Sequence, residues 1–236
     1  MEDLPNIFLS SSLTIEEIDA SLINSDLNDL RSDFVAVAIK IREGEATHAG
    51  LIISTNGKYF LFHFIPQGVG LIDVPKSEWY FHKVFDFISS DESAAFLSHC
   101  KIIKKESKPT FGYSYDGSYY DSSGTYFSKN NLPQIMTCVG FCMNVVLGYI
   151  ESKVYFEFES WPSDPSTETY FDEHEKEFIE KFPDHDIEKV KENWRRITPA
   201  EYFASGFLQI PIKRIEINKI IENVKKAIKN KQVPTS

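Results

Sequence analysis

Residues 48–65 read HAGLIISTNGKYFLFHFI, and this stretch predicts a β-hairpin. Its Asn56-Gly57 dipeptide is typical of a two-residue type I′ turn and lies between two runs of strand-forming residues. If Thr55 pairs with Lys58 across the turn, alternate side chains share one face of the hairpin. One face is then wholly apolar and should cover a core: Ala49, Leu51, Ile53, Phe60, Phe62 and Phe64.

The other face of the hairpin carries two histidines, His48 and His63. The same register puts Gly50 opposite His63 and His48 opposite Ile65, so the two imidazoles are diagonal neighbours. We therefore expect them to touch. A lone histidine at a strand end is usually structural, but a matched pair is typical of a base and the group that orients it.

A third candidate lies about ninety residues further along the chain, in the stretch MTCVGFC at 136–142. The apolar run from Cys138 to Ile150 predicts a buried central helix with Thr137 near its N-cap. A cysteine in the first turn meets the positive end of the helix dipole and unpaired backbone N–H groups. We expect this position to expose the Cys138 thiol, to lower its pKa, and to form an oxyanion site from the N–H groups of Cys138 and Val139.

The other cysteines and two further histidines have simpler readings. Cys100 and Cys142 are expected to be small buried apolar residues, although Cys142 shares a helix face with Cys138 and is the second choice of nucleophile. His82 and His99 have no chemical partners in the sequence pattern and are expected to be structural or surface residues.

Two motifs resemble a known family. His48-Ala-Gly-Leu-Ile, Asn56-Gly57 and Phe62-His63 resemble the catalytic-histidine hairpin of the NlpC-type papain-like hydrolases, and Thr137-Cys138-Val139-Gly140-Phe141 resembles their Asp-Cys-Ser-Gly-Phe nucleophile motif. Histidine precedes cysteine here, as in the circularly permuted branch of YiiX-type proteins and lecithin retinol acyltransferase-like enzymes. The resemblance spans roughly residues 34–212 and includes the stretches 68–75, 108–113 and 197–205. The family's acidic and serine residues beside the cysteine are replaced by Thr137 and Val139, which leaves the substrate class open.

The resemblance implies an α+β fold in which the Cys138 helix packs on an antiparallel sheet, as one permuted papain-like domain over residues 1–236. It implies a cysteine hydrolase that cleaves a peptide or isopeptide-type amide through an acyl-enzyme. Cys138 would be the nucleophile and His48 the base, with His63 in the role of the Asn or Asp of related triads. Two alternatives stay open: a thiol acyltransferase or thioesterase acting on lipid-linked substrates, and a catalytically idle ligand-binding module.

Two segments outside these motifs have unusual compositions. The loop 111–127 interleaves tyrosines with glycines, and we expect Tyr113, Tyr115 and Tyr119 to form a substrate-binding lip; the alternative is a self-packed surface loop. The segment 161–193 is acidic and contains Asp172-Glu173-His174-Glu175 and Asp184-His185-Asp186. These residues could ligate a metal, but the spacing of the histidines favours a solvated insertion, and we assign no metal or other cofactor.

The remaining patterns predict the other elements. Helices are expected over 14–30, 90–105 and 215–231, the last amphipathic, and a short helix should open at the capping box Thr198-Pro199-x-Glu201. Strands are expected over 33–42, 70–74, 83–87, 153–160 and 207–212.

Composition excludes some partners and leaves others open. The chain has 236 residues, 42% of them hydrophobic, which is enough for a single core. Its formal charge of −10 argues against nucleic acid and anionic membrane surfaces. The acidic start Met1-Glu2-Asp3 lacks the pattern of a secretory leader, no stretch is long enough to span a bilayer, and three cysteines suit a reducing compartment. We expect a cytoplasmic protein, with leaderless export and the oligomeric state left open.

Overall fold

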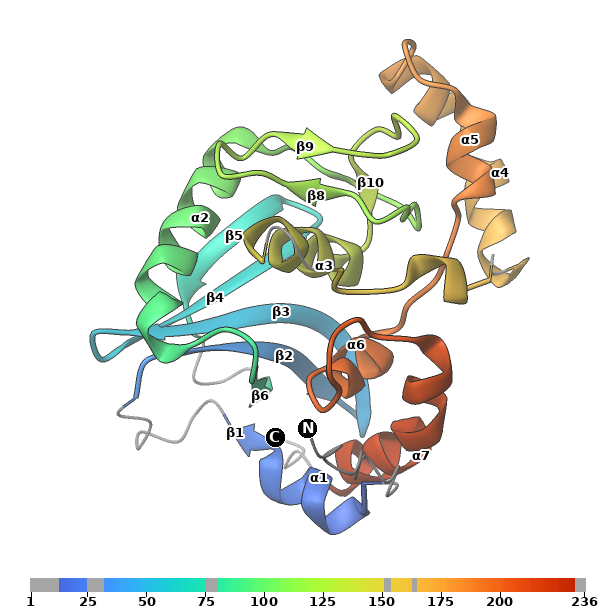
Figure 1. Cartoon of the computed structure of the whole chain (residues 1–236). Coiled ribbons are helices and arrows are strands. Elements are labelled where there is room, and N and C mark those ends of the chain that lie inside the picture. The colour runs from blue at the N-terminus through green and yellow to red at the C-terminus, as the bar shows by residue number, and fades with distance from the viewer. Residues whose placement is uncertain (1–12, 25–31, 75–79, 151–153, 163–164, 232–236) are drawn as a thin grey trace, which may run out of the picture.

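The predicted hairpin forms two neighbouring strands of a six-stranded sheet in the computed structural model, which describes residues 13–24, 32–74, 80–150, 154–162 and 165–231 (Figure 1). Strands β3 (Glu45–Thr55) and β4 (Lys58–Ile65) pair in the predicted register, Thr55 with Lys58. Asn56 and Gly57 have φ angles of 52° and 72°, as a type I′ turn requires. The hairpin prediction is confirmed.

All pairs of neighbouring strands in this sheet are antiparallel, and the strand order is β1-β6-β2-β3-β4-β5. The other members are β1 (Ile23–Asn24), β2 (Phe34–Arg42), β5 (Gly68–Asp73) and β6 (Tyr80–Val84). Two small sheets lie outside it. One pairs β7 (Thr110–Phe111) in parallel with β10 (Ile135–Met136), and the other pairs β8 (Tyr119–Tyr120) with β9 (Tyr126–Phe127).

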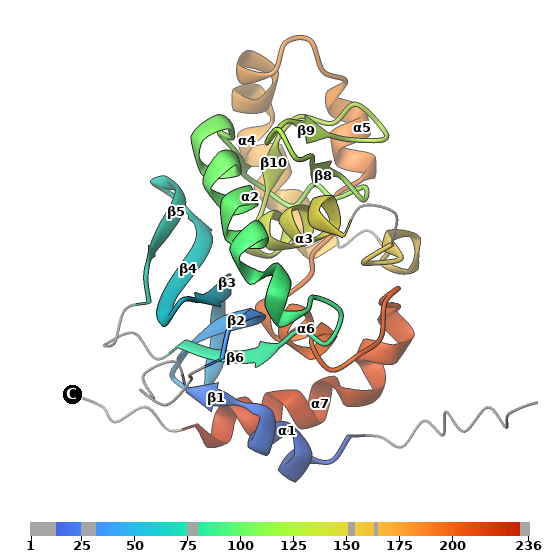
Figure 2. The same ribbon diagram turned by 60° about the vertical axis from the view of Figure 1, so that its left-hand side comes forward.

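Helices cover the apolar face of the hairpin, so the fold is α+β with an antiparallel sheet. Helices α2 (Ser93–Glu106), α3 (Cys138–Tyr149) and α6 (Pro199–Ser205) all contact β3 (Figure 2). Helix α1 (Ile15–Ser21) packs against the amphipathic α7 (Arg214–Asn230). The predicted core-facing residues are found there: Ala49, Leu51, Ile53, Phe62 and Phe64 are buried in the main core, and Phe60 packs against it.

Two smaller apolar clusters accompany the main core, where we had expected a single one. The first lies on the opposite face of the sheet and includes Phe34, Ile52 and Tyr80. The second lies under the acidic segment, which forms helices α4 (Glu168–Lys181) and α5 (Ile187–Glu192). Phe171 and Phe178 stand two turns apart on α4 and bury their rings with Trp194, so the acidic insertion has a buried apolar side beside its exposed charged one.

Other differences from the predicted elements are local. The strands expected over 153–160 and 207–212 are reduced to one bridge between Phe156 and Ile212, and a 3₁₀ turn occupies Phe158–Ser160; Lys153 lies outside the described residues. Pro211 has no N–H to give to a ladder, which accounts for part of this loss. The helix expected over 14–30 ends at Ser21, and residues 25–30 lie outside the described part of the chain. The Thr198–Glu201 capping box is confirmed.

Among the described residues, no helix combines the length and the apolar character needed to cross a membrane.

Candidate functional site

Helix α3 begins at Cys138, as predicted. The Thr137 hydroxyl accepts the N–H of Gly140 at 3.1 Å, and the Thr137 carbonyl accepts the N–H of Phe141 at 2.9 Å. Strand β10 leads directly into this turn, because Met136 is paired with Phe111 of β7. The cap and the strand together fix the cysteine in the first position of the helix.

The two histidines of the hairpin contact each other, as the register predicted. Nε2 of His48 and Nδ1 of His63 are 3.1 Å apart, and the ring planes are inclined by 72°. His63 is buried and His48 is half-buried. This hydrogen bond fixes the direction of both rings.

A glycine in the neighbouring strand makes room for the His63 ring. Gly70 of β5 is paired with His63, and a Cβ atom at Gly70 would come within 2.7 Å of the imidazole. A glycine inside a strand often marks such a close approach, and this signal in the sequence was overlooked. Gly70 thereby belongs to the structure that positions the histidine pair.

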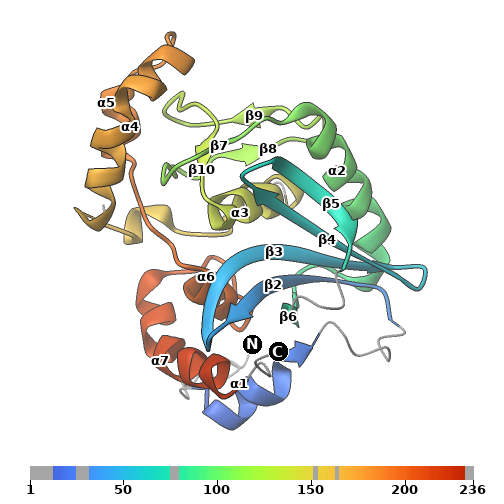
Figure 3. The ribbon, with the colours of Figure 1, turned by 180° about the vertical axis from the view of Figure 1, so that it is seen from behind.

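Strands β3 and β4 separate next to the histidines. Their pairing stops at Leu51 and Phe62, whereas β4 remains paired with β5 as far as Ile65 and β3 remains paired with β2 (Figure 3). Counting from the turn, Ala49 and Phe64 would form the next hydrogen-bonded pair of an unbroken ladder. The N–H of Ala49 instead lies near the thiol of Cys138, where it counters part of the rise in the thiol pKa that burial causes. The sulfur therefore lies at the split in the sheet, beside the peptide that joins His48 to Ala49.

The environment of the thiol differs from the expected one. Cys138 is half-buried, and burial raises its pKa, while the N–H groups of Ala49, Val139 and Cys138 itself act in the opposite direction. Because burial raises the pKa of the Cys138 thiol, the expectation of an exposed thiol with a lowered pKa is wrong. Cys100 and Cys142 are completely buried, and burial raises the pKa of each well above its ordinary value. Cys138 is the most accessible of the three thiols.

The three tyrosines of the predicted lip do not act together. Tyr115 is only 3% exposed and packs in the core against Phe158, so it cannot line a surface lip. Tyr119 stacks on Phe127 and borders a cavity at Leu147 and Gly148. That cavity is at the other end of α3 from Cys138, about 13 Å along the helix. Tyr113 packs in an aromatic group with Phe111, Tyr170 and Trp194.

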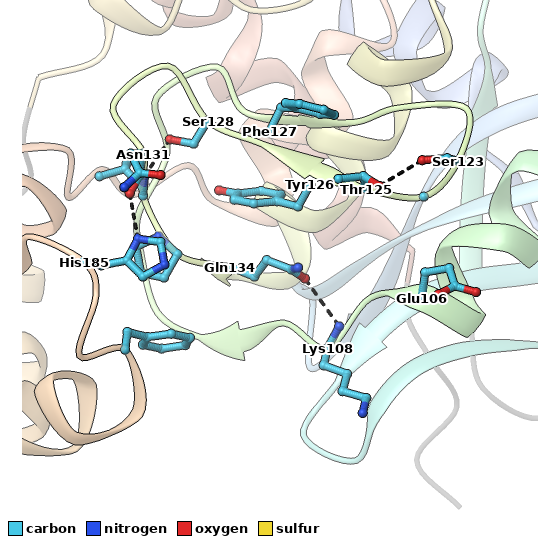
Figure 4. A pocket seen from close by; sticks show the side chains of 14 residues that line it. Glu106, Lys108, Ser123, Thr125, Tyr126, Phe127, Ser128, Asn131, Gln134 and His185 are labelled. Carbon is cyan, nitrogen blue, oxygen red and sulfur yellow. Dashed lines mark hydrogen bonds between the residues drawn. The ribbon is translucent and has the colours of Figure 1, made fainter.

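Neither the acidic segment nor a polar cavity at its edge holds the candidate triad. His174 and His185 bond the backbone carbonyls of Tyr170 and Asn131, and the described residues contain no cluster of three or more His, Cys, Asp or Glu side chains suited to a metal. A cavity of about 570 Å³ lies between Lys108, Gln134 and His185 (Figure 4). None of Cys138, His48 and His63 lines it.

Comparison of the chain with family models, with curated proteins and with solved structures finds no significant match. The geometry of the site is therefore the basis of the functional argument.

Proposed function

We propose that the protein is a cysteine-dependent hydrolase of permuted NlpC-type papain-like fold, which cleaves a peptide or isopeptide-type amide through Cys138, His48 and His63. One observation carries the proposal. The first residue of the central helix places its thiol against the His48–Ala49 peptide, while His48 is oriented by a second histidine. A structural cysteine has no need of a split ladder beside it, or of two histidines that orient each other on the parted strands.

Either ring could donate the hydrogen bond between the histidines, and the proposal requires that His48 donates it. If His48 donates from Nε2 to Nδ1 of His63, its own Nδ1 carries a lone pair and is the base for the Cys138 thiol. His63 is then neutral and protonated at Nε2. This tautomer is the one that general-base catalysis requires.

The reaction follows from these roles. The thiol proton passes to Nδ1 of His48 as the sulfur attacks the amide carbon, and the N–H groups of Cys138 and Val139 stabilise the oxyanion. The C–N bond breaks as His48 returns the proton to the leaving amine, which leaves an acyl thioester on Cys138. Water then attacks the thioester and gives a proton to His48, which returns it to the sulfur as the C–S bond breaks. A carboxylic acid is released and the Cys138 thiol is regenerated.

The test is hydrolysis of a library of fluorogenic peptide amides by the full-length protein. Cys138→Ala should abolish turnover and Cys142→Ala should retain it, because only Cys138 is at the helix start. His48→Ala should lower kcat by on the order of a thousandfold, and His63→Ala by less, since the orienter acts through the base.

The same variants are then alkylated with iodoacetamide. The proposal expects Cys138 of the His48→Ala variant to react more slowly than in the wild type. Equal alkylation rates of Cys138 in the wild type and in His48→Ala, together with turnover that survives in Cys138→Ala, would falsify the triad. Turnover of acyl thioesters with no turnover of any amide would replace the hydrolase with a thioesterase.

A further inference from the structure

A groove of about 350 Å³ lies between the end of β4, strand β7 and helix α4, and none of Cys138, His48 and His63 lines it. Its apolar lining comes from Phe64, Pro66, Phe111 and Tyr170, and Glu177 and Lys181 of α4 stand at its charged side. The volume is at the lower end of the range for small-ligand sites, about 300–1,000 Å³, and suits one or two side chains of a larger substrate.

The aromatic wall of the groove is held in place before any ligand arrives. Phe111 and Tyr170 meet edge to face with ring centres 5.5 Å apart, and Tyr113 packs at 5.6–5.7 Å against both. Phe111 nevertheless remains 43% exposed. A preformed aromatic wall with an exposed ring favours the binding of another large apolar or aromatic side chain.

The groove is continuous with the elements that carry the triad. Phe64 follows His63 directly in β4, and its ring packs against Phe141, one turn into α3. Phe111 is paired with Met136, two residues before Cys138. The groove is therefore built on the strands that lead to His63 and to Cys138.

The charge of α4 distinguishes between possible occupants. The helix carries six carboxylates against two lysines, and Glu177 faces the aromatic wall: burial and then the charge of Glu177 raise the pKa of Tyr170. A substrate with lysine or arginine beside its apolar side chain is attracted to this wall, and an acidic one is repelled.

We infer that this groove is a substrate subsite that selects a peptide with an aromatic side chain flanked by basic residues, near the amide bond to be cleaved. The inference rests on the proposed hydrolase function and specifies its substrate. It also gives the acidic insertion a role, since α4 supplies Tyr170 and Glu177.

The test measures binding to the full-length Cys138→Ala variant by fluorescence anisotropy. The probes are three fluorescein-labelled pentapeptides: KKFGG, KKAGG and EEFGG. KKFGG should bind at least roughly tenfold more tightly than KKAGG, as expected for burial of a phenyl ring. EEFGG should bind more weakly than KKFGG, and the difference should shrink at high salt.

Two matched pairs of variants locate the binding. Phe111→Ala should weaken KKFGG binding about tenfold, whereas Phe127→Ala should not; Phe127 is equally exposed at 45% and also packs on a tyrosine, but lies outside the groove. Glu177→Gln should weaken binding, whereas Glu180→Gln, whose carboxylate pairs with Lys176 on the same helix, should not.

The outcomes separate the subsite from the chemistry. Equal binding of KKFGG and KKAGG, or equal losses in Phe111→Ala and Phe127→Ala, would overturn the subsite even if the wild type hydrolyses amides. Selective binding of KKFGG that depends on Phe111, with no amide hydrolysed by the wild type, would support the subsite and overturn the hydrolase.

Discussion

At the residue scale, two effects on Cys138 oppose each other. Burial raises the pKa of the thiol, and three backbone N–H groups counter part of that rise. Because the thiolate is the nucleophile, the rate of alkylation of Cys138 should still be increasing above about pH 8.5. Peptide mass spectrometry after a short exposure to iodoacetamide should find Cys138 modified before Cys100 and Cys142. Modification of Cys142 first would contradict the position of the helix start.

Gly70 provides a second prediction at this scale. Gly70→Ala puts a methyl group against the His63 imidazole, which must turn and lose its contact with His48. We expect kcat to fall by on the order of a hundredfold with little change in KM, because the base loses its orientation while the groove is unchanged. Ile72→Ala, an exposed change on the same strand, is the control. Similar kinetics in the two variants would argue against a positioning role for Gly70.

The contact between the two candidate histidines was predictable from the sequence, but the surroundings of Cys138 were not. The Asn56-Gly57 turn sets the register locally, so the contact between His48 and His63 follows from counting. The place of the Cys138 thiol near the N–H of Ala49 depends on where β3 leaves β4, and that is decided by packing between distant segments. Burial of the thiol has the same origin.

At the element scale, α3 depends on the cap that precedes Cys138. Thr137→Ala removes the acceptor of the Gly140 N–H and should lower the free energy of unfolding by about 1 kcal/mol, whereas Thr137→Ser should retain most of it. Urea denaturation of the two variants measures this difference. The rate at which Cys138 is alkylated should also change in Thr137→Ala, since the first turn of the helix holds the thiol. An unchanged free energy of unfolding would mean that the cap contributes nothing to stability.

Elements with a strong local pattern were predicted well, and elements made by distant contacts were not. The capping box at Thr198 and the apolar stripe of α7 each lie within one segment, and both are confirmed. Tyr115 sits in a tyrosine-glycine loop that has the composition of a surface segment, yet its ring is in the core. Removing that loop would therefore take away core residues as well as surface.

At the scale of the whole molecule, a buried histidine links stability to pH. His82 is stacked on Phe34 in the cluster on the opposite face of the sheet from the main core, and burial lowers its pKa to about 4. Between pH 6.5 and 4 the unfolded chain binds a proton at this residue that the native state does not. The free energy of unfolding should therefore fall as the pH drops through this window, by on the order of 3 kcal/mol at most.

Urea denaturation of the wild type and of His82→Phe between pH 4 and 7.5 checks this dependence. The variant should lose less stability on acidification, because Phe cannot bind the proton. An NMR titration of the folded wild type provides an independent measurement: a His82 resonance that titrates near pH 6.5 would contradict the prediction.

The split between β3 and β4 has a mechanical consequence. His48 and His63 lie on two different arms of the sheet, and Leu51 and Phe62 form the last pair before the arms part. His48 is three residues beyond that pair, or about 10 Å, so widening the angle between the arms by about 5° would displace it by roughly 0.9 Å. The 3.1 Å contact between the imidazoles would then exceed hydrogen-bonding distance without the loss of a single strand. The stiffness of this hinge therefore governs how constantly the two imidazoles stay in contact.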